Sequence, residues 1–102
     1  MEDPTDYASG NWHVKEGNED TFLARWREFL EWTRKNVAGF QHAFLLRGKS
    51  DARHFVSYST WDNSASQQQW RTLPEFDTLL GACRDLCDNF QSDSYERVTT
   101  IQ

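Results

Sequence analysis

Apolar residues recur at spacings of three and four along one stretch of the chain, which predicts an amphipathic helix. Asn18 is placed to cap this helix, and Glu19 and Asp20 suit the positive end of its dipole. Gly39 suits the left-handed position that commonly ends a helix. The apolar stripe consists of Phe22, Trp26, Phe29, Leu30, Thr33 and Val37.

A second stretch with helical period begins at Pro74, a residue that is favourable at the first position of a helix. A short helical turn that carries Trp70 is expected just before it, after the cap-like residues 62–64. The apolar face of the second helix is predicted to comprise Phe76, Leu79, Leu80, Cys83, Leu86, Cys87 and Phe90.

Alternation of polar and apolar residues predicts four strands. Residues 10–15 form the first, with Trp12 and Val14 on one side. Phe40–Arg47 and His54–Trp61 are joined by a short polar turn, so they should pair as an antiparallel hairpin. Residues 95–101 are expected to form the last strand.

The predicted order is βαββαβ, which is typical of the ferredoxin-like fold of the α+β class. In this fold both helices cover one face of a four-stranded antiparallel sheet. Residues 1–8 are polar and without period, which indicates a flexible N-terminal arm, and residues 9–102 are expected to form the domain.

Both faces of the predicted hairpin carry apolar side chains, although helices should cover only one of them. A second copy of the same sheet is the simplest cover, because a two-fold dimer buries one patch against itself. We therefore expect a homodimer, against the alternative of scattered surface aromatics. In the first strand of the hairpin Phe40, Phe44 and Leu46 alternate with Ala43 and Leu45, and in the second Val56 and Tyr58 alternate with Phe55 and Trp61.

The 102 residues suffice for one domain, and 15% of them are aromatic although only 37% are hydrophobic. The apolar content is thus concentrated in rings. A net charge of -5 argues against a nucleic acid or an anionic membrane as partner. No apolar run approaches the roughly 20 residues of a membrane span, and the N-terminal residues do not resemble a signal peptide, so we expect a cytoplasmic protein.

Cys83 and Cys87 are expected to be buried free thiols. They share a face of the predicted helix but do not meet disulfide geometry, and no adjacent Cys or His completes a metal site. The sequence also contains no phosphate-binding glycine loop and no nucleophile elbow.

The order of strand, tryptophan, cap, second aromatic and new helix in residues 55–76 places bulky rings around one cleft between sheet and helices. Such a cleft is a candidate pocket for a flat organic molecule. For Trp61 and Trp70 the alternative is simple core filling between sheet and helix. The candidate pocket walls are Trp12, Phe44, Trp61, Trp70 and Phe76.

From residue 9 to residue 101 the chain resembles the antibiotic biosynthesis monooxygenase (ABM) family, whose subunits form dimeric α+β barrels. The resemblance rests on Gly39-Phe40 at the opening of the second strand, on Trp61 at the end of the third, and on the junction from Trp70 to Phe76. The family includes enzymes that use O2 on phenolic polyketides without flavin or metal, enzymes that open the haem ring, and proteins of unassigned activity.

The chain departs from both branches of the family at particular positions. The iron-binding histidine of the haem-opening branch corresponds to Leu80, which leaves haem without an axial ligand there. In the polyketide-oxidising branch the strand-end tryptophan matches Trp61, but the asparagine expected four residues earlier is Ser57. The tyrosine expected after Trp61 falls within residues 67–69, which are all glutamine.

The resemblance implies a cofactor-independent monooxygenase that oxidises an aromatic or quinol-like small molecule with O2. Such chemistry needs an apolar pocket, a base and a donor for developing charge. His42 is the candidate base, because it interrupts an apolar series and histidine is the side chain generally suited to proton transfer near neutral pH, and Tyr58 is the candidate proton donor. The alternatives are structural roles for both residues and, for the protein, a non-catalytic dimer that binds a hydrophobic molecule.

Overall fold

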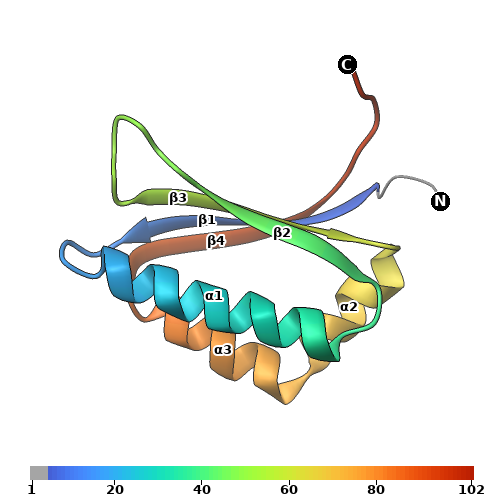
Figure 1. The fold of residues 1–102 in the computed structure, drawn as a ribbon, viewed down its shortest axis with the longest axis horizontal. Coiled ribbons are helices and arrows are strands. Elements are labelled where there is room, and N and C mark those ends of the chain that lie inside the picture. Colours follow the sequence, from blue (N-terminus) through green and yellow to red (C-terminus); the bar gives the residue numbers. More distant parts are fainter. Residues whose placement is uncertain (1–4) are drawn as a thin grey trace.

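A four-stranded antiparallel sheet, covered on one face by helices, forms the structure, a computed structural model that describes residues 5–102 (Figure 1). The strand order across the sheet is β2-β3-β1-β4, so β1 lies between β3 and β4. This is the predicted ferredoxin-like arrangement. In chain order the elements are β1 (Asp6–Val14), α1 (Glu19–Asn36), β2 (Phe40–Arg47), β3 (His54–Trp61), α2 (Ser64–Thr72), α3 (Pro74–Arg84) and β4 (Cys87–Glu96).

Helix α1 packs its predicted stripe against the sheet, with Phe22 and Phe29 among its buried residues. Gly39 has the expected positive φ, 89°, but it lies in the turn before β2 and does not end the helix, because α1 ends at Asn36 and its C-cap Val37 is extended. The predicted cap at Asn18 is wrong in detail, because the side chain of Asn18 does not accept a hydrogen bond from the first turn. It donates instead to the carbonyl oxygen of Leu86 at 3.5 Å.

Helices α2 and α3 begin where the sequence predicts. The Asn63 side chain accepts a hydrogen bond from the backbone N–H of Ser66 at 2.9 Å, which caps α2. Pro74 occupies the first turn of α3, where its missing N–H leaves no hydrogen bond unmade.

The prediction for the last strand is wrong. Helix α3 ends at Arg84, and Cys87 and Phe90, which were predicted to lie on its buried face, belong to β4. Strand β4 ends at Glu96, so most of the predicted strand 95–101 lies outside it. The physical reason is pairing, because β4 bonds with β1 along its whole length, from Asp6 opposite Glu96 to Val14 opposite Cys87.

The predicted start of β1 is also wrong. The strand begins at Asp6 rather than at residue 10, and it ends at Val14. Residues 6–8 of the predicted flexible arm therefore lie in the sheet, where Ala8 pairs with Ser59 and with Ser94. Residues 1–4 lie outside the described residues.

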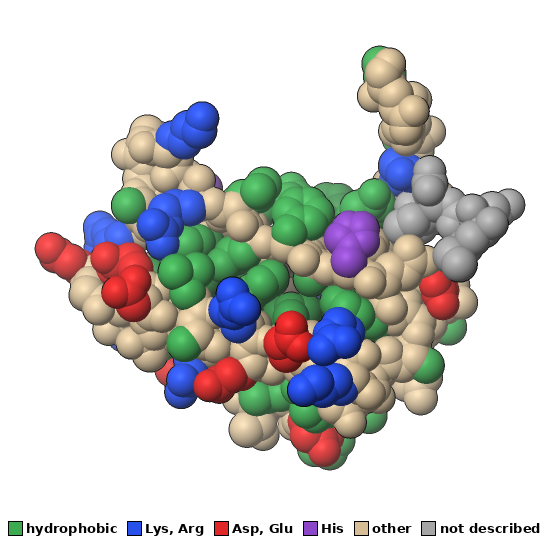
Figure 2. All heavy atoms as spheres, in the orientation of Figure 1, with side chains coloured by type: hydrophobic (Ala, Val, Ile, Leu, Met, Phe, Trp, Pro, Cys, Tyr) green, Lys and Arg blue, Asp and Glu red, His purple; other side chains and the backbone are tan. Residues whose placement is uncertain are grey.

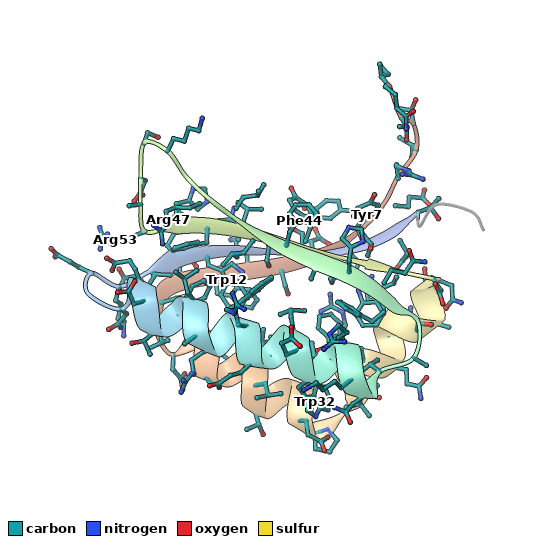
Figure 3. The ribbon with its side chains drawn as sticks, viewed as in Figure 1. Tyr7, Trp12, Trp32, Phe44, Arg47 and Arg53 are labelled. Carbon is teal, nitrogen blue, oxygen red and sulfur yellow. The ribbon has the colours of Figure 1, made fainter. Side chains whose placement is uncertain are left out.

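Alternation along the strands gives the sheet two different faces. The face toward the helices carries Trp12, which is 2% exposed, whereas Phe44 and Tyr7 lie on the opposite side (Figure 3). Figure 2 shows apolar side chains gathered on that opposite side, between the β2–β3 turn and the C-terminal segment. We call the opposite side the outer face.

An irregularity in β2 changes the side on which one predicted residue lies. The pairing of β2 with β3 shifts between Phe40 and His42, so the simple alternation of the strand is broken there. Phe40 consequently packs edge-on against Trp61, with ring centroids 5.5 Å apart. It packs with the core rather than on the side of Phe44 and Leu46, with which the predicted alternation grouped it.

Both cysteines are free, with Cys83 buried and Cys87 half-buried. The prediction of unpaired thiols is confirmed. Among the helices of residues 5–102, none combines the length and the apolar character that crossing a membrane requires.

Candidate functional site

A narrow cavity lies between the sheet and the helices, beside the N-terminal half of β1. The sheet supplies its floor, α1 and α3 supply apolar walls, and the end of α2 supplies an aromatic and a charged side chain. The lining residues are Ala8, Ser9, Gly10, Trp12, Trp26, Leu30, Ser57, Tyr58, Ser59, Trp70, Arg71, Phe76, Leu80, Phe90 and Ser92.

Small residues at the centre of the sheet create the floor. Gly10 lies between Ser57 of β3 and Ser92 of β4, so three neighbouring strands present almost no side-chain bulk there. A Cβ on Gly10 would lie 2.6 Å from Trp12 Nε1 and 2.7 Å from Ser57 Oγ. Glycine is therefore required for the close approach of these two side chains.

The aromatic walls are held by buried hydrogen bonds. Trp12 Nε1 donates to Ser57 Oγ at 3.0 Å, and Trp70 Nε1 donates to Thr33 Oγ1 at 3.1 Å. Phe76 meets the Trp70 ring edge-on, with centroids 4.8 Å apart. Because each indole N–H has a partner, the rings keep fixed orientations and present apolar surfaces to the cavity.

Trp61 supports the wall from behind. It is fully buried, its Nε1 donates to Ser59 Oγ at 2.9 Å, and its ring lies 4.7 Å from that of Trp70. It is absent from the residues that line the cavity. The predicted wall residue Trp61 is therefore a packing partner of the wall.

The cavity is small, with a volume of about 40 Å³. Pockets for drug-sized ligands are roughly 300–1,000 Å³. A wider crevice of about 280 Å³ lies beside the edge of β2, and Trp26 and Leu30 line both spaces. Of these two shared residues, Leu30 is buried and Trp26 is half-buried.

One charged side chain, Arg71, is found among the described residues that line the cavity. Its guanidinium carbon lies 5.8 Å from the Trp70 ring centroid and 5.9 Å from that of Phe76. Removal from water lowers the pKa of the Arg71 guanidinium, whereas the charges of Asp93 and Asp6 raise it. Arginine keeps its charge under such shifts, so the cavity has a cationic edge.

Buried Gln67 organises this edge. Its Oε1 accepts hydrogen bonds from Arg71 Nε at 3.3 Å and from Ser94 Oγ at 2.5 Å. Its Nε2 donates to Asp6 Oδ2 at 2.6 Å. Gln67 thereby ties α2 to β1 and β4 and fixes where Arg71 lies.

The structure divides the predicted site residues between the two faces of the sheet. Trp12, Trp70 and Phe76 share the cavity. Phe44 does not, because it lies on the outer face, 40% exposed, with its ring 5.5 Å from that of Tyr58. Its predicted place in the same wall is therefore wrong for a single subunit.

The two predicted catalytic side chains are also on the outer face. His42 is exposed there, with Nδ1 3.2 Å from Thr60 Oγ1. Tyr58 faces Phe44, and it borders the cavity only as part of the strand that forms the floor. His42 does not line the cavity but lines the neighbouring crevice beside β2, so it reaches only a guest that extends into that crevice.

Leu80, which corresponds to the iron-binding histidine of the haem-opening branch, lines the cavity. Within residues 5–102 the lining includes no histidine, so a haem iron there would find no imidazole ligand. In the same part of the chain, no three His, Cys, Asp or Glu side chains are grouped to hold a metal ion.

Sequence reasoning missed Gln67, Arg71 and Trp26 as site residues. A signal for the first two exists, because residues four apart share a helix face and Arg71 directly follows Trp70. Trp26 was recognised only as part of an apolar stripe, and nothing in the spacing distinguishes a rim residue from a core residue.

Comparison with known proteins identifies relatives of this fold. A family profile described as "Antibiotic biosynthesis monooxygenase" matches residues 7–80. A mutant form of SnoaB, described as a cofactor-independent oxygenase from Streptomyces nogalater, superimposes with a TM-score of 0.87 at 16% identity, covering 97% of this chain and 98% of its own. No curated protein sequence matches the chain significantly.

Two further solved structures are similar. A candidate antibiotic biosynthesis monooxygenase from Deinococcus radiodurans has a TM-score of 0.82 at 17% identity, over 95% of this chain and 96% of its own. A conserved protein from Methanosarcina mazei Go1 has a TM-score of 0.82 at 12% identity, over 93% and 94%. At these identities the structural likeness establishes the fold.

Proposed function

Because the chain belongs to the antibiotic biosynthesis monooxygenase family, we propose that it oxidises a planar aromatic or quinol-like molecule with O2 and without a bound cofactor. The observation that supports this proposal is the cavity between sheet and helices, whose walls include Trp12, Trp70 and Phe76. A flat ring system can stack on such walls, and the helices exclude water from it.

Oxygenation without a cofactor requires a substrate that itself donates electrons to O2, such as a phenol that has lost its proton. Conversion of a phenol to a quinone balances with one molecule of O2. One oxygen atom forms the new ring carbonyl and the other leaves as water, which takes up the hydrogens of the phenol O–H and the ring C–H. The substrate supplies all the electrons.

A planar aromatic molecule is larger than the cavity of about 40 Å³, so the cavity must open to admit it. Trp26 and Leu30 separate the cavity from the crevice beside β2, and Trp26 is only half-buried. Rotation of the Trp26 ring costs few buried contacts compared with movement of the fully enclosed Trp61. We therefore place substrate entry at Trp26.

The active form in this proposal is a homodimer joined through the outer face. Three large apolar side chains of that face are substantially exposed, at 40% for Phe44, 52% for Leu46 and 53% for Tyr95. A contiguous apolar surface of this kind marks an interaction site. A second copy offers a matching surface by symmetry.

His42 remains a hypothesis as the catalytic base, because it lines the crevice beside β2 and not the cavity of its own subunit. Its position outside the cavity of its own subunit predicts that His42→Ala changes turnover by less than about twofold, because uninvolved groups contribute little to the barrier. A loss of about 100-fold, typical of a missing general base, would restore the assignment.

Oxygen uptake tests the proposed function. Purified protein is mixed with hydroxylated polycyclic phenols, and O2 consumption is followed with an electrode while isotopically labelled O2 traces the new carbonyl oxygen. We expect uptake that depends on the protein and label in both the product and water. If ligands raise the melting temperature but no phenol of the panel is consumed, the oxygenase proposal fails.

A second candidate function is non-catalytic binding of a hydrophobic molecule. The observation that favours it is the absence of an Asp, Glu, His or Lys side chain from the cavity lining within residues 5–102. Under this alternative the guest leaves the protein chemically unchanged, which mass spectrometry of the extracted ligand would reveal.

A further inference from the structure

Arg71 is a half-buried cation at the edge of an otherwise neutral, aromatic cavity. A guanidinium has five N–H donors in a planar fork that matches the two oxygens of a carboxylate. Within residues 5–102, the Arg71 fork donates to one group only, Gln67 Oε1, from Nε at 3.3 Å and from an Nη at 3.1 Å. The remaining donors have no protein partner in that part of the chain.

No carboxylate among residues 5–102 neutralises this cation at close range. The ion pairs in residues 5–102 are Arg25 with Glu28 and Arg34 with Glu31, so no carboxylate oxygen lies within 4.0 Å of Arg71. Asp6, one of the acids that influence it, already accepts hydrogen bonds on both oxygens, at 2.9 Å from Ser64 and at 2.6 Å from Gln67. Both oxygens of Asp6 thus accept hydrogen bonds from neutral donors and not from Arg71.

Such an arrangement is costly in the empty protein. Arg71 is partly removed from water and has Asp93 and Asp6 only as more distant counter-charges, so an anion that binds directly to its fork adds stabilisation that these acids do not give. Gln67 is fixed by bonds to two strands, so the Arg71 fork is held in place before a ligand arrives. Preorganisation of this kind increases affinity because fewer groups must be ordered on binding.

We propose that Arg71 binds an anionic oxygen of the guest, so that the cavity selects planar aromatic molecules carrying a carboxylate or a phenolate over their neutral counterparts. This inference rests on the proposed function for its aromatic guest and deepens it. Trp70 and Phe76 contact the ring system, and the fork of Arg71 receives the charged oxygen. Gln67 is a positioning residue, since it acts through Arg71.

The selection of an anion also resolves a chemical difficulty. The lining of the cavity itself contains no carboxylate or imidazole base within residues 5–102, and Glu31 and His42 lie in the lining of the crevice beside β2. A guest that has already lost its proton to water does not need such a base. The Arg71 charge lowers the pKa of a phenol next to it and so favours that form.

Ligand binding to the full chain under anaerobic conditions tests the proposal without turnover. Naphthoate and naphthamide have the same ring and nearly the same shape but differ in charge, and quenching of tryptophan fluorescence reports their binding. We expect naphthoate to bind about 10- to 100-fold more tightly than naphthamide, the range of a charge-assisted hydrogen bond. Equal affinities, or no binding of naphthoate, would overturn the proposal.

Variants of Arg71 identify the residue responsible. Arg71→Met keeps the apolar stem and should remove the preference for naphthoate while leaving naphthamide affinity within about twofold. Arg71→Lys keeps the charge without the fork and should retain part of the preference. Arg84→Met, at the exposed end of α3, is the matched control and should bind as the wild type does. Equal weakening of acid and amide in both Arg71 variants would show a structural role only.

A hydroxyanthraquinone distinguishes phenolate from carboxylate as the preferred anion. Alizarin is titrated into the protein on both sides of its hydroxyl ionisation, with anthraquinone as the neutral reference. Tighter binding of the ionised form that disappears in Arg71→Met supports the proposal, and binding that ignores ionisation of both probes contradicts it. If anion selectivity holds but no oxygen is consumed, only the proposed oxygenation fails.

Discussion

The helix-covered face and the outer face of the sheet differ in how far their side chains are buried, although residues of the two faces alternate along the same strands. On the helix-covered face each buried indole N–H has a partner, as Trp12 has in Ser57 and Trp61 in Ser59. On the outer face Phe44 and Tyr95 remain 40% and 53% exposed. One face is completed by the chain itself, and the other is not.

The helix-covered face therefore contributes to the folding of one subunit, whereas in the proposed dimer the outer face contributes to association between subunits. Burial of apolar area drives folding only where the chain supplies the cover, which here is the face under α1 and α3. The apolar area of the outer face contributes stabilisation only when another surface covers it. Substitutions on the two faces should therefore differ in whether their effects depend on protein concentration.

The largest effect is expected from Trp61→Ala on the helix-covered face. Removal of this fully buried ring should lower the free energy of unfolding by about 3–5 kcal/mol, at any protein concentration. Urea unfolding measures the change. Phe44→Ala is the comparison, with a loss under about 1 kcal/mol in dilute protein. Equal losses in the two variants would remove the distinction between the faces.

The next effect concerns assembly. Phe44→Glu places a charge in the centre of the proposed interface and should weaken dimerisation by about 2–4 kcal/mol, the range of an interface hot spot. Light scattering should then report the 12.0 kDa subunit instead of its dimer. Thr78→Glu makes the same charge change on exposed α3 and should leave the dimer intact. A wild-type protein that is monomeric at high concentration would contradict the prediction.

A smaller effect probes the floor of the cavity. Gly10→Ala places a methyl group 2.6 Å from Trp12 Nε1 and should cost about 1–3 kcal/mol through overpacking, together with weaker ligand binding. The same change at Gly81 in α3 meets its nearest atom at 3.7 Å and should stabilise by about 0.5–1 kcal/mol. Thermal unfolding of both variants measures the two signs, and a harmless Gly10→Ala would show that the floor is not tightly packed.

The smallest effect is a pH dependence of the helix-covered face. Burial raises the pKa of the Cys83 thiol from 9.0 to about 12. Between these values the unfolded chain loses the thiol proton and the folded chain keeps it, so stability falls as pH rises, by at most about 1.4 kcal/mol per pH unit. Urea unfolding on both sides of about pH 9 should show a shallower decline in Cys83→Ala. Identical declines would show that the thiol is not protected.

The elements that the sequence predicted well are those with bulky apolar residues. Helix α1 and the β2–β3 hairpin have the predicted bounds or nearly so, because large side chains make the helical and strand periods visible. Confirmation of the family followed from the same elements, within residues 7–80.

The predictions failed where the sheet carries small or polar residues toward the helices. Ala8 and Gly10 of β1 and Ser92 of β4 form the floor of the cavity, so neither strand shows strong alternation there. Phe90, the one large residue of β4 on this face, fell by chance in register with the preceding helix.

The sequence by itself determined the class of fold and the aromatic character of the pocket, because both depend on local period and composition. Only the tertiary structure decided which candidates share a space. It put Trp12, Trp70 and Phe76 together with Arg71, and it sent His42 and Phe44 to the outer face. The physical reason is that the side on which a strand residue lies depends on register and bulges, such as the one between Phe40 and His42, which are set by pairing with distant strands.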